Sequence, residues 1–134
     1  MNVLEAIQNR RSIRKYQDRQ IPKEALEKIM EAGTCAPNAG GGQRTIICGV
    51  HNKELTARLG ILNLAHFDRS RLAGGFVSKE QPSNIDDPTI KNGFYGAPSV
   101  CVVFAPDNFL YSIPDAFCCC LLYTSDAADE ARSV

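Results

Sequence analysis

The sequence has no long apolar run, no excess of charge of either sign and no paired cysteine motif. Its apolar runs stay far below the roughly 20 residues that a helix needs to cross a bilayer. The first residues, Met1 to Glu5, include an early acid and lack the apolar core of a signal peptide. These absences predict a cytoplasmic protein without a membrane partner.

The formal net charge is zero, because 15 Lys and Arg residues balance 15 Asp and Glu residues. A polybasic coat for RNA or DNA needs net positive charge, so nucleic acid is not an expected partner. The charge is nevertheless uneven, since residues 1–23 hold six basic and two acidic side chains, a balance of +4. A neutral chain with one basic corner predicts a local anion site rather than a surface for a long polyanion.

The cysteines are few and do not form a recognisable framework. Three adjacent thiols cannot converge on one tetrahedral metal from a regular element, and no Cys-x-x-Cys pair exists. Without a secretory signal, a disulfide framework is not expected either. We interpret all six as small buried apolar residues and expect no metal site: Cys35, Cys48, Cys101, Cys118, Cys119 and Cys120.

Hydrophobic spacing and capping residues predict four helices and two strands. The first helix is expected to begin at Asn2, with Glu5 completing a capping box. The others are expected to begin at Pro22, at residue 53 after an Asn cap, and at Pro114. The strands are expected over 45–50, as a buried strand, and over 100–105. Residues 68–93 are rich in Gly, Ser, Pro, Asn and Asp and predict mostly loop. The resulting order of elements is an α+β pattern.

The sequence changes character from about residue 120. The run Cys-Leu-Leu-Tyr-Thr-Ser-Asp-Ala-Ala-Asp-Glu carries no apolar stripe that would continue the last predicted helix. This string resembles the conceptual translation of a sequencing-library adapter, with a natural polar tail as the alternative. We therefore expect one partial domain over residues 1–119, cut inside a helix, and a non-native tail over 120–134. Such a cut would leave Ile46, Val102 and Phe104 uncovered on a small sheet.

Arg10-Arg11-Ser12-Ile13-Arg14 is a dense set of hydrogen-bond donors. Arginine forks match phosphate oxygens bidentately, so three guanidiniums and a hydroxyl within five residues suit an anion. The stretch lies between a predicted helix and a predicted extended segment, from which its side chains can surround one small ligand. The alternative interpretation is a solvated basic turn.

A second candidate segment is Cys35-Ala36-Pro37-Asn38-Ala39-Gly40-Gly41-Gly42-Gln43. Its glycines permit positive φ and close approach of the backbone to a flat ligand. The spacing is not that of a dinucleotide-binding fingerprint, and no Gly-Lys-Ser/Thr follows to make a Walker A loop. By itself, this segment is also consistent with a flexible connection.

These two segments, followed by Phe94-Tyr95-Gly96-Ala97-Pro98 before a valine-rich strand, resemble the FMN-dependent nitroreductase family. The motifs stand in the family's order, and the resemblance covers residues 1 to about 119. It implies a nitroreductase-like sheet flanked by helices, here incomplete. It also implies an intertwined homodimer with two FMN sites at the subunit interface.

The resemblance assigns contacts with FMN residue by residue. Arg10, Ser12 and Arg14 match positions that hold the phosphate, the ribityl chain and the pyrimidine edge, and Arg11 contributes locally. The positions of the second segment match a loop that the partner subunit lays against the flavin: Pro37, Asn38, Ala39 and Gly41. Gly41 departs from the more usual Asn and so lacks one side-chain contact. No metal ligand and no catalytic side chain is implied.

The resemblance further implies a ping-pong cycle in which NAD(P)H donates hydride to FMN. A small-molecule acceptor, such as a nitroaromatic or a quinone, then takes the electrons. A positive group at the pyrimidine edge, here Arg14, would stabilise the anionic reduced flavin. The 119-residue piece alone is expected to be inactive. The competing hypotheses are a non-catalytic anion- or flavin-binding module built on Arg10–Arg14, and the same fold with another reaction, such as dehalogenation or flavin storage.

Overall fold

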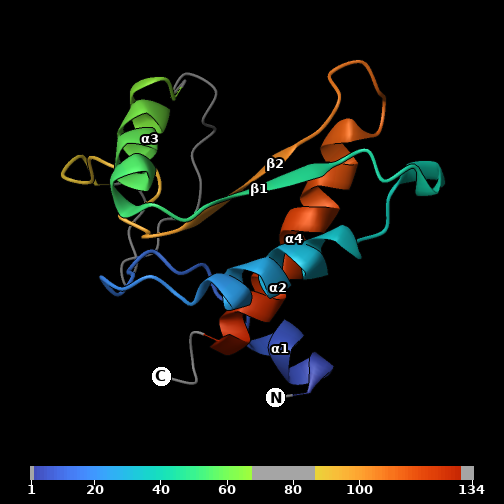
Figure 1. Ribbon diagram of the computed structural model, residues 1–134, viewed down its shortest axis with the longest axis horizontal. Coiled ribbons are helices and arrows are strands. Elements are labelled where there is room, and N and C mark those ends of the chain that lie inside the picture. Colours follow the sequence, from blue (N-terminus) through green and yellow to red (C-terminus); the bar gives the residue numbers. More distant parts are fainter. Residues whose placement is uncertain (1, 68–86, 131–134) are drawn as a thin grey trace. The chain divides into compact units, whose positions relative to one another are not determined.

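The computed structural model describes residues 2–67 and 87–130, with side chains as far as residue 122. Five elements come before the undescribed stretch: α1 (Val3–Asn9), α2 (Lys23–Thr34), the 3-10 turn η1 (Ala39–Gly41), β1 (Ile46–Val50) and α3 (Lys53–Ala65). Two follow it: β2 (Val100–Phe104) and α4 (Ser112–Glu130) (Figure 1). This mixture of helices with a small sheet confirms the predicted α+β class.

The chain forms two compact units within what the sequence predicts as one domain. The first unit comprises residues 1–11, 21–49 and 101–134, and the second comprises residues 12–20 and 50–100. The first unit therefore holds α1, α2, α4 and nearly all of the sheet, whereas the second holds α3. Most of the loop predicted over 68–93 lies outside the described residues, and residues 87–93 form turns and irregular backbone.

The predicted helix starts are confirmed at α1 and α3. The side chain of Asn2 accepts from the Glu5 N–H, and the Glu5 carboxylate accepts from the Asn2 N–H, both at 2.9 Å. The side chain of Asn52 accepts from the Leu55 N–H at 2.9 Å and caps α3 in the same way. Each cap satisfies a backbone donor that the first turn of a helix leaves without a partner.

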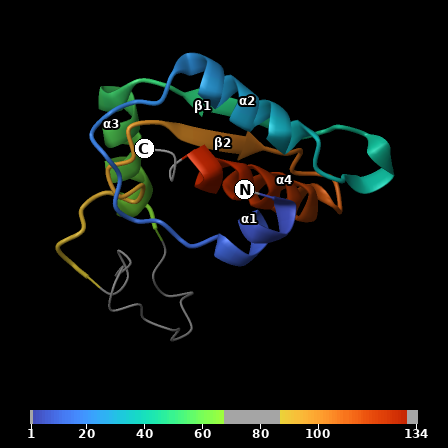
Figure 2. The same ribbon diagram turned by 90° about the horizontal axis from the view of Figure 1, so that it is seen from below.

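In the first unit, α2 and α4 pack against each other, and α1 packs against α4 (Figure 2). The face that α2 buries carries Leu26, Ile29 and Gly33, which follows the predicted helical spacing. Gly49 of β1 lies against the same helix, because a Cβ built there would come 2.7 Å from the Met30 sulfur. The absence of a side chain at Gly49 therefore lets the strand approach α2 closely.

The two strands form a two-stranded sheet in which they run in opposite directions (Figure 1). The prediction that the first strand is buried is wrong, since Ile46 is 67% exposed and Cys48 is also exposed. Phe104 on β2 is 56% exposed, as expected for an uncovered sheet, and Val102 is half-buried. An apolar sequence predicts a strand, but its burial depends on whether other elements cover it.

The cysteine interpretation holds for Cys119 alone, which is fully buried on α4. Its neighbour Cys118 is exposed, because consecutive residues of a helix point about 100° apart. Cys35 and Cys48 are exposed too, whereas Cys101 and Cys120 are half-buried, and all six are free thiols. Burial raises the pKa of the Cys101 and Cys119 thiols. In the described ranges, no three His, Cys, Asp or Glu side chains are placed to hold a metal ion.

Helix α4 begins at Ser112, two residues before the predicted start, and continues to Glu130. It therefore crosses residue 119 without interruption, whereas the sequence predicts a domain end there. The origin of the segment after residue 119 stays a prediction. None of the helices in the described part of the chain has the length and apolar content that a bilayer crossing requires.

Candidate functional site

The arginine-rich segment begins where α1 ends. Arg10 is the C-terminal cap of α1, with its N–H donating to the Ala6 carbonyl at 3.0 Å, and its φ of −55° and ψ of 128° turn the chain out of the helix. The residues that follow adopt no helix or strand. The boundary between the two units falls within this segment, so Arg10 and Arg11 belong to the first unit and Ser12 and Arg14 to the second.

The arginines of this segment have different surroundings. Arg11 Nη1 donates to the carbonyls of Gln8 and Arg10, each at 2.9 Å, and so satisfies acceptors at the end of α1. The Arg14 guanidinium lies over the ring of Tyr95, 5.9 Å from its centroid. Among the described residues, the guanidinium of Arg10 makes no hydrogen bond or ion pair. Arg10 is therefore available to an anion, whereas Arg11 has a structural role.

The second candidate segment forms a closed loop in the first unit. Asn38 Oδ1 accepts from the Gln43 N–H at 2.9 Å, and Asn38 Nδ2 donates to the Ala36 carbonyl at 3.4 Å. The loop turns through η1, where Gly40 and Gly41 both have φ of 63°. The structure thus brings Pro37, Asn38, Ala39 and Gly41 into one tight turn, with the Asn38 side chain holding its two ends together.

The conformation of Gly41 explains which residues suit this position. A φ of 63° lies in the left-handed region, which glycine adopts freely and asparagine tolerates better than most other residues. A Cβ built at Gly41 would meet no atom within 4 Å. Gly41 therefore fits this backbone conformation and leaves open space beside it, and the Asn that the resemblance would lead one to expect here would fit the same backbone.

The loop is attached to α4 by a residue that the sequence analysis missed. Asp115 is buried, and its Oδ1 accepts from the Ala39 N–H at 3.0 Å. Arg44 adds a second attachment, since its Nη1 donates to the Ala39 carbonyl at 3.1 Å and its guanidinium lies 4.4 Å from the centroid of the Phe109 ring. The sequence offers little signal for Asp115, because an acid in the first turn of a helix is usually explained by the helix dipole.

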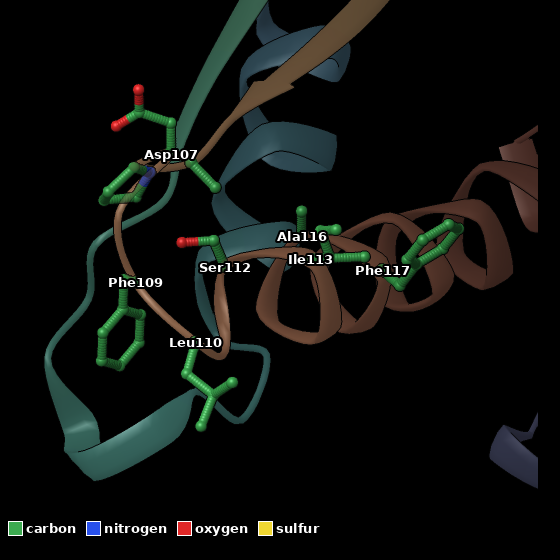
Figure 3. Close-up of a pocket in the computed structure, with 9 residues that line it drawn as sticks. Asp107, Phe109, Leu110, Ser112, Ile113, Ala116 and Phe117 are labelled. Carbon is green, nitrogen blue, oxygen red and sulfur yellow. The ribbon is translucent and has the colours of Figure 1, made fainter.

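A hollow of about 420 Å³ lies between the turn after β2 and the start of α4 (Figure 3). Its wall is mostly apolar and includes Phe109, Leu110, Ile113 and Phe117. Ser112 also lines the hollow, and its buried Oγ has no hydrogen-bond partner among the described residues. The only ionisable group in this wall is Asp107. The hollow therefore suits the packing of an apolar group better than acid–base chemistry.

Comparison with known families and sequences gives a consistent result. The profile of the family described as "Nitroreductase family" matches residues 7–133. A Methanothermobacter thermautotrophicus protein described as an NADH dehydrogenase/NAD(P)H nitroreductase is 46% identical over 59 residues, which are 44% of this chain and 31% of that relative. The FMN reductase (NAD(P)H) of Bacillus subtilis is 33% identical over 73 residues, or 54% of this chain and 25% of that protein.

Solved structures confirm the expected nitroreductase-like fold. A Bacteroides fragilis nitroreductase with bound FMN matches with a TM-score of 0.75 and 25% identity, over 97% of this chain and 66% of that one. The Mycobacterium smegmatis FMN-dependent nitroreductase in complex with NADPH matches in fold with a TM-score of 0.69 and 18% identity, over 95% and 70% of the two chains. By contrast, the matches to the curated relatives span about a third or less of those proteins.

The attachment of the loop by Asp115 can be tested by substitution. Asp115→Ala removes the acceptor of the Ala39 N–H, so we expect faster hydrogen exchange at that amide and a loss of about 1–3 kcal/mol in the free energy of unfolding. Asp115→Asn keeps a carbonyl oxygen and should preserve most of the protection. Amide exchange followed by NMR measures both, with Asp107→Ala, an exposed acid, as the control. Unchanged exchange at Ala39 in Asp115→Ala would contradict this role.

Proposed function

The chain belongs to the nitroreductase family, and from this premise we propose that the complete protein is an FMN-dependent oxidoreductase. It takes electrons from NADH or NADPH and passes them to a small acceptor such as a nitroaromatic or a quinone. The observation that carries this proposal is the family match over residues 7–133, which includes both candidate segments. The FMN, NAD(P)H and NADPH named for the relatives and solved structures support the choice of cofactor and donor.

The residues of the arginine-rich segment fit FMN by their chemistry. Arg10 offers a guanidinium that the described residues leave without a partner, which suits the doubly charged phosphate. Ser12 is exposed and can donate to the ribityl hydroxyls. Arg14 is half-buried and would place positive charge at the pyrimidine edge, where negative charge develops on reduction. Arg11 contributes indirectly, because it donates to two carbonyls at the end of α1, beside Arg10.

The glycine loop fits the flat ring of the cofactor. The open space beside Gly40 and Gly41 allows the backbone to approach a planar ligand, and the hydrogen bonds of Asn38 and Asp115 hold the loop in one conformation beforehand. We assign Pro37, Asn38, Ala39 and Gly41 to the FMN site of the partner subunit. When bound, FMN supplies the chemistry of hydride acceptance and electron delivery. The chain binds and orients it, and no side chain is assigned a catalytic role.

A direct assay tests the reaction. The complete protein, which contains residues 1–119 of this chain, is purified and supplied with FMN, and the oxidation of NADH and of NADPH is followed by absorbance in the presence of a nitroaromatic or a quinone. We expect acceptor-dependent oxidation, with initial rates that give parallel lines in double-reciprocal plots, as a ping-pong cycle requires. FMN binding without any NAD(P)H oxidation would instead favour the non-catalytic flavin-binding module.

The arginine assignments predict unequal effects. In the complete protein, Arg10→Ala and Arg14→Ala should each weaken FMN binding by about 1.5–3 kcal/mol, the range for hydrogen bonds to charged groups. Arg11→Ala should act mainly on the stability of α1, and Arg19→Ala, outside the motif, should change little. Quenching of flavin fluorescence measures each dissociation constant at a fixed ionic strength. Equal losses at all four positions would show that general basicity, and not a site, binds the cofactor.

We also propose that the protein is a homodimer and that α4 forms part of its interface. The face of α4 opposite its buried residues carries large apolar side chains at helical spacing, namely Ile113 and Phe117, which are 70% and 71% exposed. Leu110, two residues before the first residue of α4, is also exposed and lines the same hollow as Ile113 and Phe117. Exposed apolar patches of this kind are typical of association surfaces. We propose that a second copy of the chain covers this apolar stripe.

A charged substitution on this stripe tests the interface. Phe117→Glu should shift the protein from dimer to monomer at micromolar concentration, because a carboxylate would have to be buried at an apolar contact. Light scattering coupled to size-exclusion chromatography gives the mass, and Ile61→Glu on α3, which is exposed to a comparable extent, is the matched control. A dimer that persists in Phe117→Glu would exclude this face, and a monomeric wild-type protein would contradict the dimer itself.

A further inference from the structure

Tyr95 lies in a tight turn of the second unit that is fixed to α3 at two points. The Gly93 N–H donates to the Gly60 carbonyl at 2.8 Å, and Asn92 Nδ2 donates to the Ala57 carbonyl at 3.2 Å. Within the turn, the Tyr95 N–H donates to the Asn92 carbonyl at 3.1 Å. The base of the Tyr95 side chain is therefore held on a rigid helix, although the residue itself belongs to a loop.

The backbone of Tyr95 is in an uncommon conformation. Its φ is 55°, in the left-handed region that aromatic residues rarely adopt, and the following Gly96 has φ of 76°. Such a conformation persists only where the surrounding structure fixes it, as the bonds to α3 do here. Glycine or asparagine would adopt this turn more readily than tyrosine. The backbone conformation therefore gives no reason for a tyrosine at this position, so the reason must lie in the contacts of its ring.

The ring lies against Arg14. The guanidinium carbon of Arg14 is 5.9 Å from the ring centroid, within the range of a cation–π interaction. Arg14 is half-buried, whereas Arg11 and Lys15 on the same segment are exposed. An arginine on a segment without helix or strand loses much rotamer freedom when a ligand fixes it. Contact with a rigid ring removes part of that freedom before the ligand binds, which strengthens binding.

A second tyrosine holds the backbone beside Arg14. The Tyr16 hydroxyl donates to the Ile13 carbonyl at 3.0 Å, which closes the short stretch that carries Arg14. Burial, and then the neighbouring Tyr95, raise the pKa of the Tyr16 hydroxyl above its usual range. Arg14 is thus located by its own backbone stretch and by a ring that α3 holds.

We propose that Tyr95 is a positioning residue for Arg14, and that its ring sets the guanidinium in place for the anionic edge of FMN. This inference rests on the proposed function, which makes FMN the ligand of Arg14. It gives a residue of the Phe94–Pro98 motif a role in FMN binding, and this motif is separate in sequence from the two candidate segments. The property that matters is the aromatic face and not the hydroxyl.

Two substitutions separate the ring from the backbone. Tyr95→Phe keeps the aromatic face, and we expect the dissociation constant for FMN to stay within about twofold of the wild type. Tyr95→Asn removes the ring but tolerates the left-handed conformation, and we expect the constant to rise about 2- to 30-fold, the range for a cation–π contact. Phe94→Leu, which removes an aromatic ring from the same turn, is the matched control. Flavin fluorescence quenching gives the constants, and thermal unfolding checks the fold.

A double-substitution cycle with Arg14→Ala decides between positioning and a general structural role. If Tyr95 acts through Arg14, Tyr95→Asn should add little to the loss already caused by Arg14→Ala. Fully additive losses, or a loss in Tyr95→Phe equal to that in Tyr95→Asn, would overturn the inference and leave the proposed function intact. A wild-type protein that takes up no FMN would overturn the proposed function and this inference together.

Discussion

The buried carboxylate of Asp115 is the constraint on which the candidate site of the first unit depends. A carboxylate removed from water must be matched by hydrogen-bond donors, and the Ala39 N–H supplies one at 3.0 Å. This hydrogen bond joins the loop over 35–43 to α4, and α4 in turn packs on α2 and α1. Arg44 donates to the Ala39 carbonyl and also lies over the ring of Phe109, which precedes α4. The glycines can therefore supply a left-handed turn without making the loop loose.

The arginine-rich segment shows how neighbouring residues of one type divide their roles. Arg11 donates to two carbonyls at the end of α1, Arg14 lies over the ring of Tyr95, and the Arg10 guanidinium has no hydrogen bond or ion pair among the described residues. Composition alone treats the three as equivalent donors. Their difference arises because the helix ends at Arg10, which directs successive side chains to different surroundings. An anion site of this kind needs few charges, which is compatible with a net charge of zero.

Helix α4 exposes large apolar side chains on its outer face, and this connects the fold to the proposed dimer. One face packs inside the first unit, where Cys119 is buried, and the other exposes Ile113 and Phe117. The chain covers 31% of one curated relative and 66% of a solved structure of the family. The outer face of α4 is the surface that the proposed dimer would cover, and Ile46 is a second exposed apolar side chain, on the sheet.

The sequence by itself determined the local features: the capped starts of α1 and α3, the stripe of α2, both strands, the α+β class and the motifs that indicate the family. These depend on neighbours within a few residues, so periodicity and capping chemistry are sufficient to find them. The burial of β1, the exposure of Cys118, the extent of α4 and the contacts of Asp115 and Tyr95 were decided by the tertiary structure. Asp115 lies 76 positions from Ala39 along the chain, and Tyr95 lies 81 positions from Arg14. No local pattern encodes such pairs, because they exist only once separate elements have packed together.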